Sequence, residues 1–177
     1  VEVHQSKLGS SDVVMGARLN LLRQASSSGS SLSLNEIGSS EDDDWWVELH
    51  NPGSSAIDLA GHRLSINGDA SRDYTFAAGQ LAPGALVAYS SATTGLYPED
   101  GDSLFLFSPG GVPVDDAIID NAPRGRLQGK PHGSFYTPDT ITPNEHNVIS
   151  FQEDVVINEV MYHHRPQYSE AGDPPTF

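Results

Sequence analysis

The stretch Trp45–Gly53, WWVELHNPG, decides the fold class because it reads as one short strand with a defined end. Its apolar and polar residues alternate, with Val47 and Leu49 on one face and Glu48 and His50 on the other. Alternation with a period of two is the pattern of a half-buried β-strand. The Asn-Pro-Gly that follows predicts a turn, in which proline fixes φ and the glycine supplies a positive φ.

Short apolar runs of the same kind occur on both sides of this stretch, and each is closed by Gly, Pro, Asn, Asp or Ser. They are SLSLNEI (31–37), AIDLAGHRLSINGD (56–69), RDYTF (72–76), GALVAYSS (84–91) and SLFLFSPGGVPVDDAIID (103–120). We expect turns at Asn67-Gly68 and at Pro109–Gly111. The run 104–107 is apolar on both faces, so we expect that strand in the interior. Because no stretch sustains helical periodicity, the chain is predicted to be an antiparallel β-sandwich or barrel.

Composition narrows the range of partners. The chain has a net charge of −15 with only nine Lys and Arg, so it lacks the basic stripe that nucleic acid and anionic membrane surfaces require. It has no cysteine, which excludes disulfides and thiolate metal ligands. No apolar run reaches the roughly 20 residues that span a bilayer, so we expect no direct membrane insertion.

The chain also divides into segments. A Ser/Gly linker at 26–31 separates two segments. Residues 1–25 contain an alternating run over 13–21, and we expect them to be the closing strands of a preceding, truncated β-sandwich or jelly-roll domain. The words VEVHQ and SSD in this segment resemble the last strands of galactose-binding-like jelly rolls in large exported bacterial proteins.

One word occurs twice. LNEIG at Leu34–Gly38 returns as INEVM at Ile157–Met161, which makes Asn35 and Asn158 corresponding positions. We therefore expect one domain over 32–150. Residues 151–177 are expected to begin a second, truncated repeat or a following domain.

The body of the chain resembles a known family over nearly its whole length and in the right order. The stretches that carry the likeness are LSLNEI (32–37), DDDWWVELHNPGSSAIDLAGHRLS (42–65), YTFAAGQLAPGALVAYSS (74–91), DSLFLFSPGGVPVDDAIID (102–120) and GRLQGKPHGSFYTPDTITPNEHN (125–147). They are similar to the lamin-tail domain of bacterial proteins. One departure is Pro143–His146, where the family more often has Pro-Gly.

The resemblance implies an immunoglobulin-like antiparallel β-sandwich, flanked here by fragments of neighbouring β domains. It further implies a non-catalytic accessory domain in a long bacterial protein that is secreted or held at the cell surface. In that family the companions include spore-coat-protein-H-like kinases and hydrolytic enzymes.

The acidic run Glu41, Asp42, Asp43 and Asp44 is the main candidate for a cation site. Calcium prefers six to eight oxygen ligands, and carboxylates supply them. The alternative is a solvated loop between two strands. The run does not follow the EF-hand spacing, and we expect folding without calcium or any other cofactor.

Trp45 and Trp46 are the candidate ligand or interface contacts. Adjacent residues of a strand face opposite sides, so one ring should enter the core and the other should lie near the surface. An exposed ring stacks on sugars or anchors an interface. The alternative is an edge-strand tryptophan covered by a loop.

No catalytic group is predicted. Histidines 50, 62, 132 and 146 are scattered, and His163-His164 are adjacent, a poor geometry for one metal. The chain contains neither H-E-x-x-H nor G-x-S-x-G. Glu36 and Glu48 imitate a carboxylate dyad, and we interpret them as polar outer-face positions on neighbouring strands.

These observations favour a non-enzymatic spacer or interaction domain. Its expected partners are neighbouring domains of the same chain, or protein or polysaccharide at the cell surface. The alternatives are a carbohydrate-binding accessory domain, or an accessory segment of an enzyme whose catalytic domain lies outside this chain.

Overall fold

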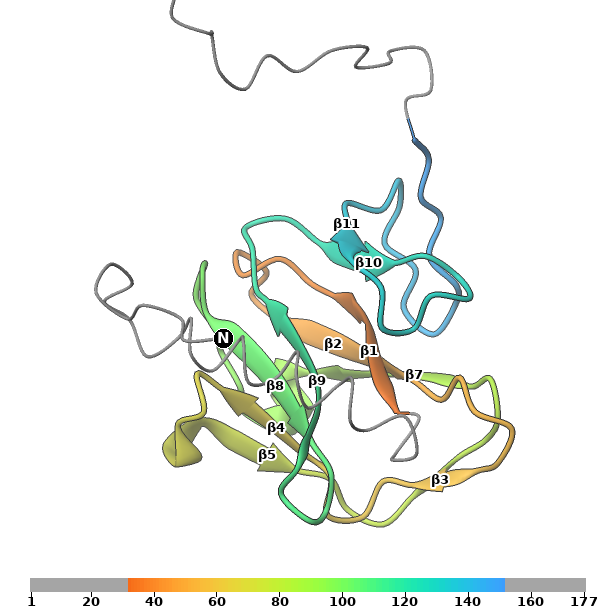
Figure 1. Cartoon of the computed structure of the whole chain (residues 1–177). Helices are drawn as coiled ribbons and strands as arrows, with labels where there is room; N and C mark the ends of the chain where they lie inside the picture. The colour runs from red at the N-terminus through yellow and green to blue at the C-terminus, as the bar shows by residue number, and fades with distance from the viewer. Residues whose placement is uncertain (1–31, 152–177) are drawn as a thin grey trace, which may run out of the picture.

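The computed structural model describes residues 32–151, and these residues form an all-β antiparallel sandwich, as the alternation predicted. One sheet has the strand order β11-β10-β1-β2-β7 and the other β5-β4-β8-β9, while β3 and β6 form a separate pair. Figure 1 shows the two sheets as the layers of the body. The strands are β1 (Ser33–Ile37), β2 (Trp46–His50), β3 (Ile57–Asp58), β4 (Arg63–Ile66), β5 (Asp73–Thr75), β6 (Gln80–Leu81), β7 (Leu86–Ser90), β8 (Ser103–Phe107), β9 (Pro113–Ile118), β10 (Arg124–Arg126) and β11 (Phe135–Tyr136). Two short helical turns, η1 (Ala70–Arg72) and α2 (Ser91–Thr94), lie in the connections.

The core lies between the inner faces of the two sheets. Val47 and Leu49 of β2 are fully buried, which confirms the face that alternation assigned to them. They meet buried leucines and isoleucines of β4 and β8 in one apolar cluster, which also contains Trp45. Because burial of apolar surface is the dominant favourable contribution to folding, this cluster defines which face of each strand is inner.

The apolar strand β8 is an interior strand, as expected, between β4 and β9. Leu104 and Leu106 point into the core and are fully buried. Phe105 and Phe107 lie on the opposite face, where Phe105 is 7% exposed. The guanidinium of Arg63 lies 4.3 Å from the centre of the Phe107 ring, so a charged side chain shields part of this second apolar row.

Two of the predicted turns form as expected. Asn67 and Gly68 both have positive φ, 56° and 68°, and β8 and β9 form a hairpin around Pro109–Gly111. The expectation for Gly53 was wrong, because Gly53 does not have a positive φ. The side chain of Asn51 holds that turn instead, since its Oδ1 accepts a hydrogen bond from the Gly53 N–H at 3.0 Å.

A buried ion pair joins the sheets along one side of the sandwich. Asp115 of β9, in the four-stranded sheet, accepts the backbone N–H of Leu34 of β1 at 2.8 Å. Arg126 of β10 holds the same carboxylate in a two-pronged contact and also donates to the carbonyl of Leu34 at 2.6 Å. The side chains of Asp115 and Arg126 are 0% and 2% exposed. A polar clasp, defined here as Asp115, Arg126 and the Leu34 peptide groups, therefore bridges the two layers.

The described chain enters the body at β1 and leaves it from the segment that follows β11 (Figure 1). The predicted segments 1–25 and 26–31, and all but the first residue of 151–177, are outside the described residues, as are the word at 157–161 and His163-His164. No helix within 32–151 is both long enough and apolar enough to cross a membrane.

Candidate functional site

Two glutamates lie side by side on neighbouring strands of the five-stranded sheet. Glu36 of β1 is the direct partner of Glu48 in β2, on the face that points away from the core. Their outer-face position agrees with the sequence interpretation. Both residues are nevertheless 0% exposed, which corrects the picture of ordinary polar surface positions.

A β-bulge places this pair. The register of β1 and β2 shifts between Leu34, which pairs with Leu49, and Glu36, which pairs with Glu48. Asn35 is the extra residue, and bulges of this kind re-aim side chains. The Asn35 amide donates to Glu48 at 2.7 Å, so the bulge also supplies the pair with a hydrogen-bond donor.

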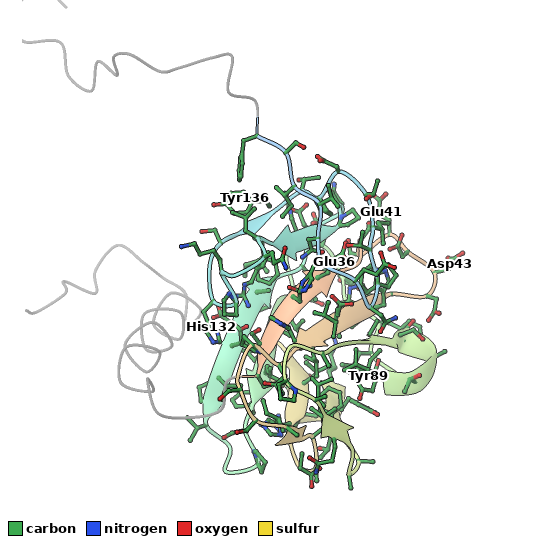
Figure 2. All side chains as sticks on the ribbon, turned by 90° about the vertical axis from the view of Figure 1, so that its right-hand side faces the viewer. Glu36, Glu41, Asp43, Tyr89, His132 and Tyr136 are labelled. Carbon is green, nitrogen blue, oxygen red and sulfur yellow. The ribbon has the colours of Figure 1, made fainter. Side chains whose placement is uncertain are left out.

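The cover over the pair is the segment 139–148, which we call the strap; its ends are joined by a bridge between Thr140 and Val148. The Thr142 N–H lies 3.2 and 3.3 Å from the two carboxylate oxygens of Glu36, and its hydroxyl lies 3.2 Å from one of them. The Asn144 N–H donates to Glu48. Figure 2 shows Glu36 on the side of the sheet along which the strap runs.

Small residues flank the pair and make room for the strap. The register sets Gly125 of β10 opposite Glu36 and Ala88 of β7 opposite Glu48. A Cβ on Gly125 would lie 2.8 Å from the Asn147 amide, too close for any other residue without a shift. That amide donates to the carbonyls of Asn35 and Arg126 at 3.1 and 2.9 Å.

At the other side of the sheet, Asn144 meets the edge strand β7. Its Oδ1 accepts a hydrogen bond from the Ala88 N–H at 3.0 Å. β7 is the last strand of the described sheet, so no further strand lies beside it to accept this N–H. Asn144 has a φ of 66°, a left-handed conformation that asparagine tolerates better than most residues. The side chain of Asn144 therefore makes a contact that a glycine at this position would lack.

Burial makes the pair easy to protonate. Burial raises the pKa of Glu48 to about 7, the negative charge of Glu36 adds to the rise, and the bonds from Asn35 and Asn144 oppose it. Burial likewise raises the pKa of Glu36, against the bonds from Thr142. The pair is therefore suited to hold a proton near neutral pH, and neither carboxyl is exposed to a substrate.

Two histidines that the sequence left scattered come together beside the pair. His50 follows Glu48 on the same face of β2, and its ring lies 6.0 Å from that of His146 of the strap, at a right angle. Burial lowers the pKa of His50, and the neighbouring His146 lowers it further. The other two described histidines lie elsewhere: His62 is buried, and His132 is 3.8 Å from Asp115.

The acidic run lies in the loop between β1 and β2, and all four side chains are exposed. Figure 2 shows Asp43 pointing away from the body. Asp42 accepts the Ser39 N–H at 3.1 Å. Within residues 32–151, no three His, Asp or Glu side chains are grouped to hold a metal ion.

Asp44 has a local structural task that the sequence reading missed. It accepts from the Ser91 hydroxyl at 2.9 Å and from the Ala92 N–H at 3.1 Å, at the start of α2. These bonds lower its pKa. Asp44 and Ser91 are 47 residues apart, so no local motif announces the contact.

The tryptophans divide as predicted. Trp45 is 1% exposed and belongs to the core, whereas Trp46 lies half-buried on the outer face of β2. β2 lies between β1 and β7 in the sheet, so Trp46 is not on an edge strand. A Cβ on Gly38 would come within 2.8 Å of the Trp46 indole nitrogen, so glycine makes the space in which this ring lies.

We compared the chain with protein families, curated proteins and solved structures, and found no match.

Proposed function

We propose that this chain supplies a non-catalytic β-sandwich that acts as a spacer or interaction domain in an exported or cell-surface multidomain bacterial protein. The observation that carries the proposal is that the described chain enters the sandwich at β1 and leaves it after β11, two strands away in the same sheet (Figure 1). The chain continues beyond both residues 32 and 151. A domain connected in this way separates whatever precedes it from whatever follows it. The resemblance of its motifs to the lamin-tail domain gives the proposal its family and cellular setting.

The internal contacts support a rigid spacer. The buried ion pair of Asp115 and Arg126 ties the two sheets together, and the strap covers the outer face of one sheet. Buried charge pairs of this kind break only at a high free-energy cost. The distance between the two ends should therefore vary little.

A pair of spin labels tests the spacer. The natural chain has no cysteine, so Ser54→Cys and Ser150→Cys give one label near each end, both at exposed positions. We expect a single narrow distance distribution by pulsed electron resonance at pH 5, below the raised pKa of Glu48. A broad or multiple distribution in the folded protein would count against a spacer.

A second candidate function is carbohydrate binding, which the partly exposed side chain of Trp46 favours. Glycan-array binding that is lost in Trp46→Ala would support it. The matched control is Tyr97→Ala, which removes a different aromatic side chain that is 65% exposed. An array without signal would leave the spacer as the sole proposal.

A further inference from the structure

The strap is attached to the sheet by two kinds of contact. Asn147 and Asn144 make neutral hydrogen bonds to the backbone of β1, β10 and β7. Thr142 and Asn144 donate to the carboxyls of Glu36 and Glu48, which titrate. The neutral bonds set how firmly the strap is held, and the carboxyls make that hold depend on pH.

Closing the strap takes both carboxyls out of water. A carboxylate that loses its hydration is disfavoured relative to the neutral acid, and two carboxylates on directly opposite residues also repel each other. By linkage, a state in which the pair holds its proton more tightly is a state that protons stabilise. Protons therefore favour the closed strap, and ionisation of both groups favours the open one.

The sign follows from the direction of the shifts. The pKa of Glu48 in the closed state is raised from 4.5 to about 7. The stabilisation of the closed strap is thus complete below about pH 4.5 and is lost as pH rises through about 7. The ratio of open to closed strap grows by at most about tenfold per pH unit for one proton within that window.

Other titratable groups near the pair are few. From β2 the neighbour is His50, and from the strap it is His146; Glu145 and Asp139 of the strap are exposed. β10 and β7 present Gly125 and Ala88. Protonation of both histidines would make two like charges repel, but the lowered pKa of His50 places that effect on the acidic side of its usual 6.5.

We propose that the strap is a proton-controlled latch: it stays closed over the sheet while the Glu36–Glu48 pair retains a proton, and it opens when both carboxyls are ionised. Opening exposes the Glu36–Glu48 pair of β1 and β2 that the strap covers. The inference does not depend on the proposed spacer function.

A mobility measurement on the full chain tests the latch. A nitroxide at Glu145→Cys, on the exposed turn of the strap, reports its motion between pH 5 and 8.5. We expect an immobile spectrum at low pH and a mobile component that grows as pH rises through the titration of the pair. In Glu48→Gln the strap should stay immobile across this range, because the pair then carries at most one charge.

The controls separate this mechanism from a general effect of charge. Glu41→Gln removes the same charge from the exposed loop, and its mobility curve should match that of the parent. His50→Gln should also keep the alkaline rise. An unchanged rise in Glu48→Gln, or a strap that stays immobile up to pH 8.5 in the parent, overturns the proposal.

A second measurement needs no variant, so it holds even if Glu48→Gln fails to fold. Carboxyl ¹³C shifts of Glu36 and Glu48 in the unsubstituted chain follow the two protons directly. At least one of the pair should titrate more than one pH unit above the usual 4.5. Titration of both groups at the usual value overturns the latch.

Discussion

Substitution of Arg126 by alanine should be among the most damaging single changes in the described body. The guanidinium holds both oxygens of Asp115 and donates to the carbonyls of Leu34, Pro131 and Gly133. It also lies 4.1 Å from the centre of the Phe135 ring. Alanine removes all of these contacts and leaves a carboxylate that is 0% exposed.

The expected loss of stability follows from the buried Asp115 carboxylate, which loses its ion-pair partner in this variant. Removing one partner of a buried ion pair costs about 3–5 kcal/mol, and a domain has only about 5–15 kcal/mol of stability. A domain of this size loses several degrees of Tm per kcal/mol, so Arg126→Ala should lower Tm by on the order of 10–20 °C. Arg124→Ala is the matched control in the same strand, since its pair with Asp120 is 31% and 35% exposed. An exposed pair contributes at most about 1 kcal/mol.

Urea unfolding at constant pH measures both variants and a double-mutant cycle with Asp115→Asn. Removing the aspartate charge should restore part of the loss, so the double variant should be less destabilised than the sum of the two single variants. The reasoning fails if Arg126→Ala and Arg124→Ala cost the same, or if the cycle shows no coupling. Arg126→Lys should rescue only part of the stability, because an ammonium group cannot make the two-pronged contact.

Three further changes are checked by thermal unfolding. Phe105→Ala should cost about 3–5 kcal/mol because the ring is 7% exposed, and Phe107→Ala, which is half-buried, should cost clearly less; equal losses would contradict the burial difference. Asn144→Ala should be about 1–2 kcal/mol less stable than Asn144→Gly, since only glycine takes the φ of 66° without strain; the reverse order would show that the turn relaxes. Millimolar calcium should leave Tm unchanged in the natural chain and in Asp43→Asn, and a rise of many degrees that the variant loses would establish a cation site.

The elements of the fold were predictable because local patterns determine them. Alternation at Val47 and Leu49 assigned the inner face of β2, and the doubly apolar run 104–107 assigned an interior strand. The Asn67-Gly68 turn has the residue types that positive φ requires. The clasp between Asp115 and Arg126 was not predictable, because an isolated Asp and Arg in a sequence do not reveal which strands bring them together.

The candidate site was half predictable for a similar reason. Alternation placed Glu48 on the outer face, but continued from Leu32 and Leu34 it would point Glu36 inward, and only the bulge at Asn35 turns Glu36 outward. Outer-face glutamates normally meet water. Their burial depends on Thr142 and Asn144, which are 106 and 96 residues away along the chain. Only the fold shows that the strap crosses these two strands. Nothing in the sequences of β1 and β2 predicts that another segment covers their outer face.

The Asn-Glu sequence at Asn35 and Glu36 has a physical role in this arrangement. In β1 the asparagine is the bulge residue. Its side-chain amide donates to Glu48, and its carbonyl accepts a hydrogen bond from the Asn147 amide. The glutamate that follows is turned outward and accepts the strap. Both residues thus take part in one arrangement, a bulged first strand whose outward glutamate is covered by the strap.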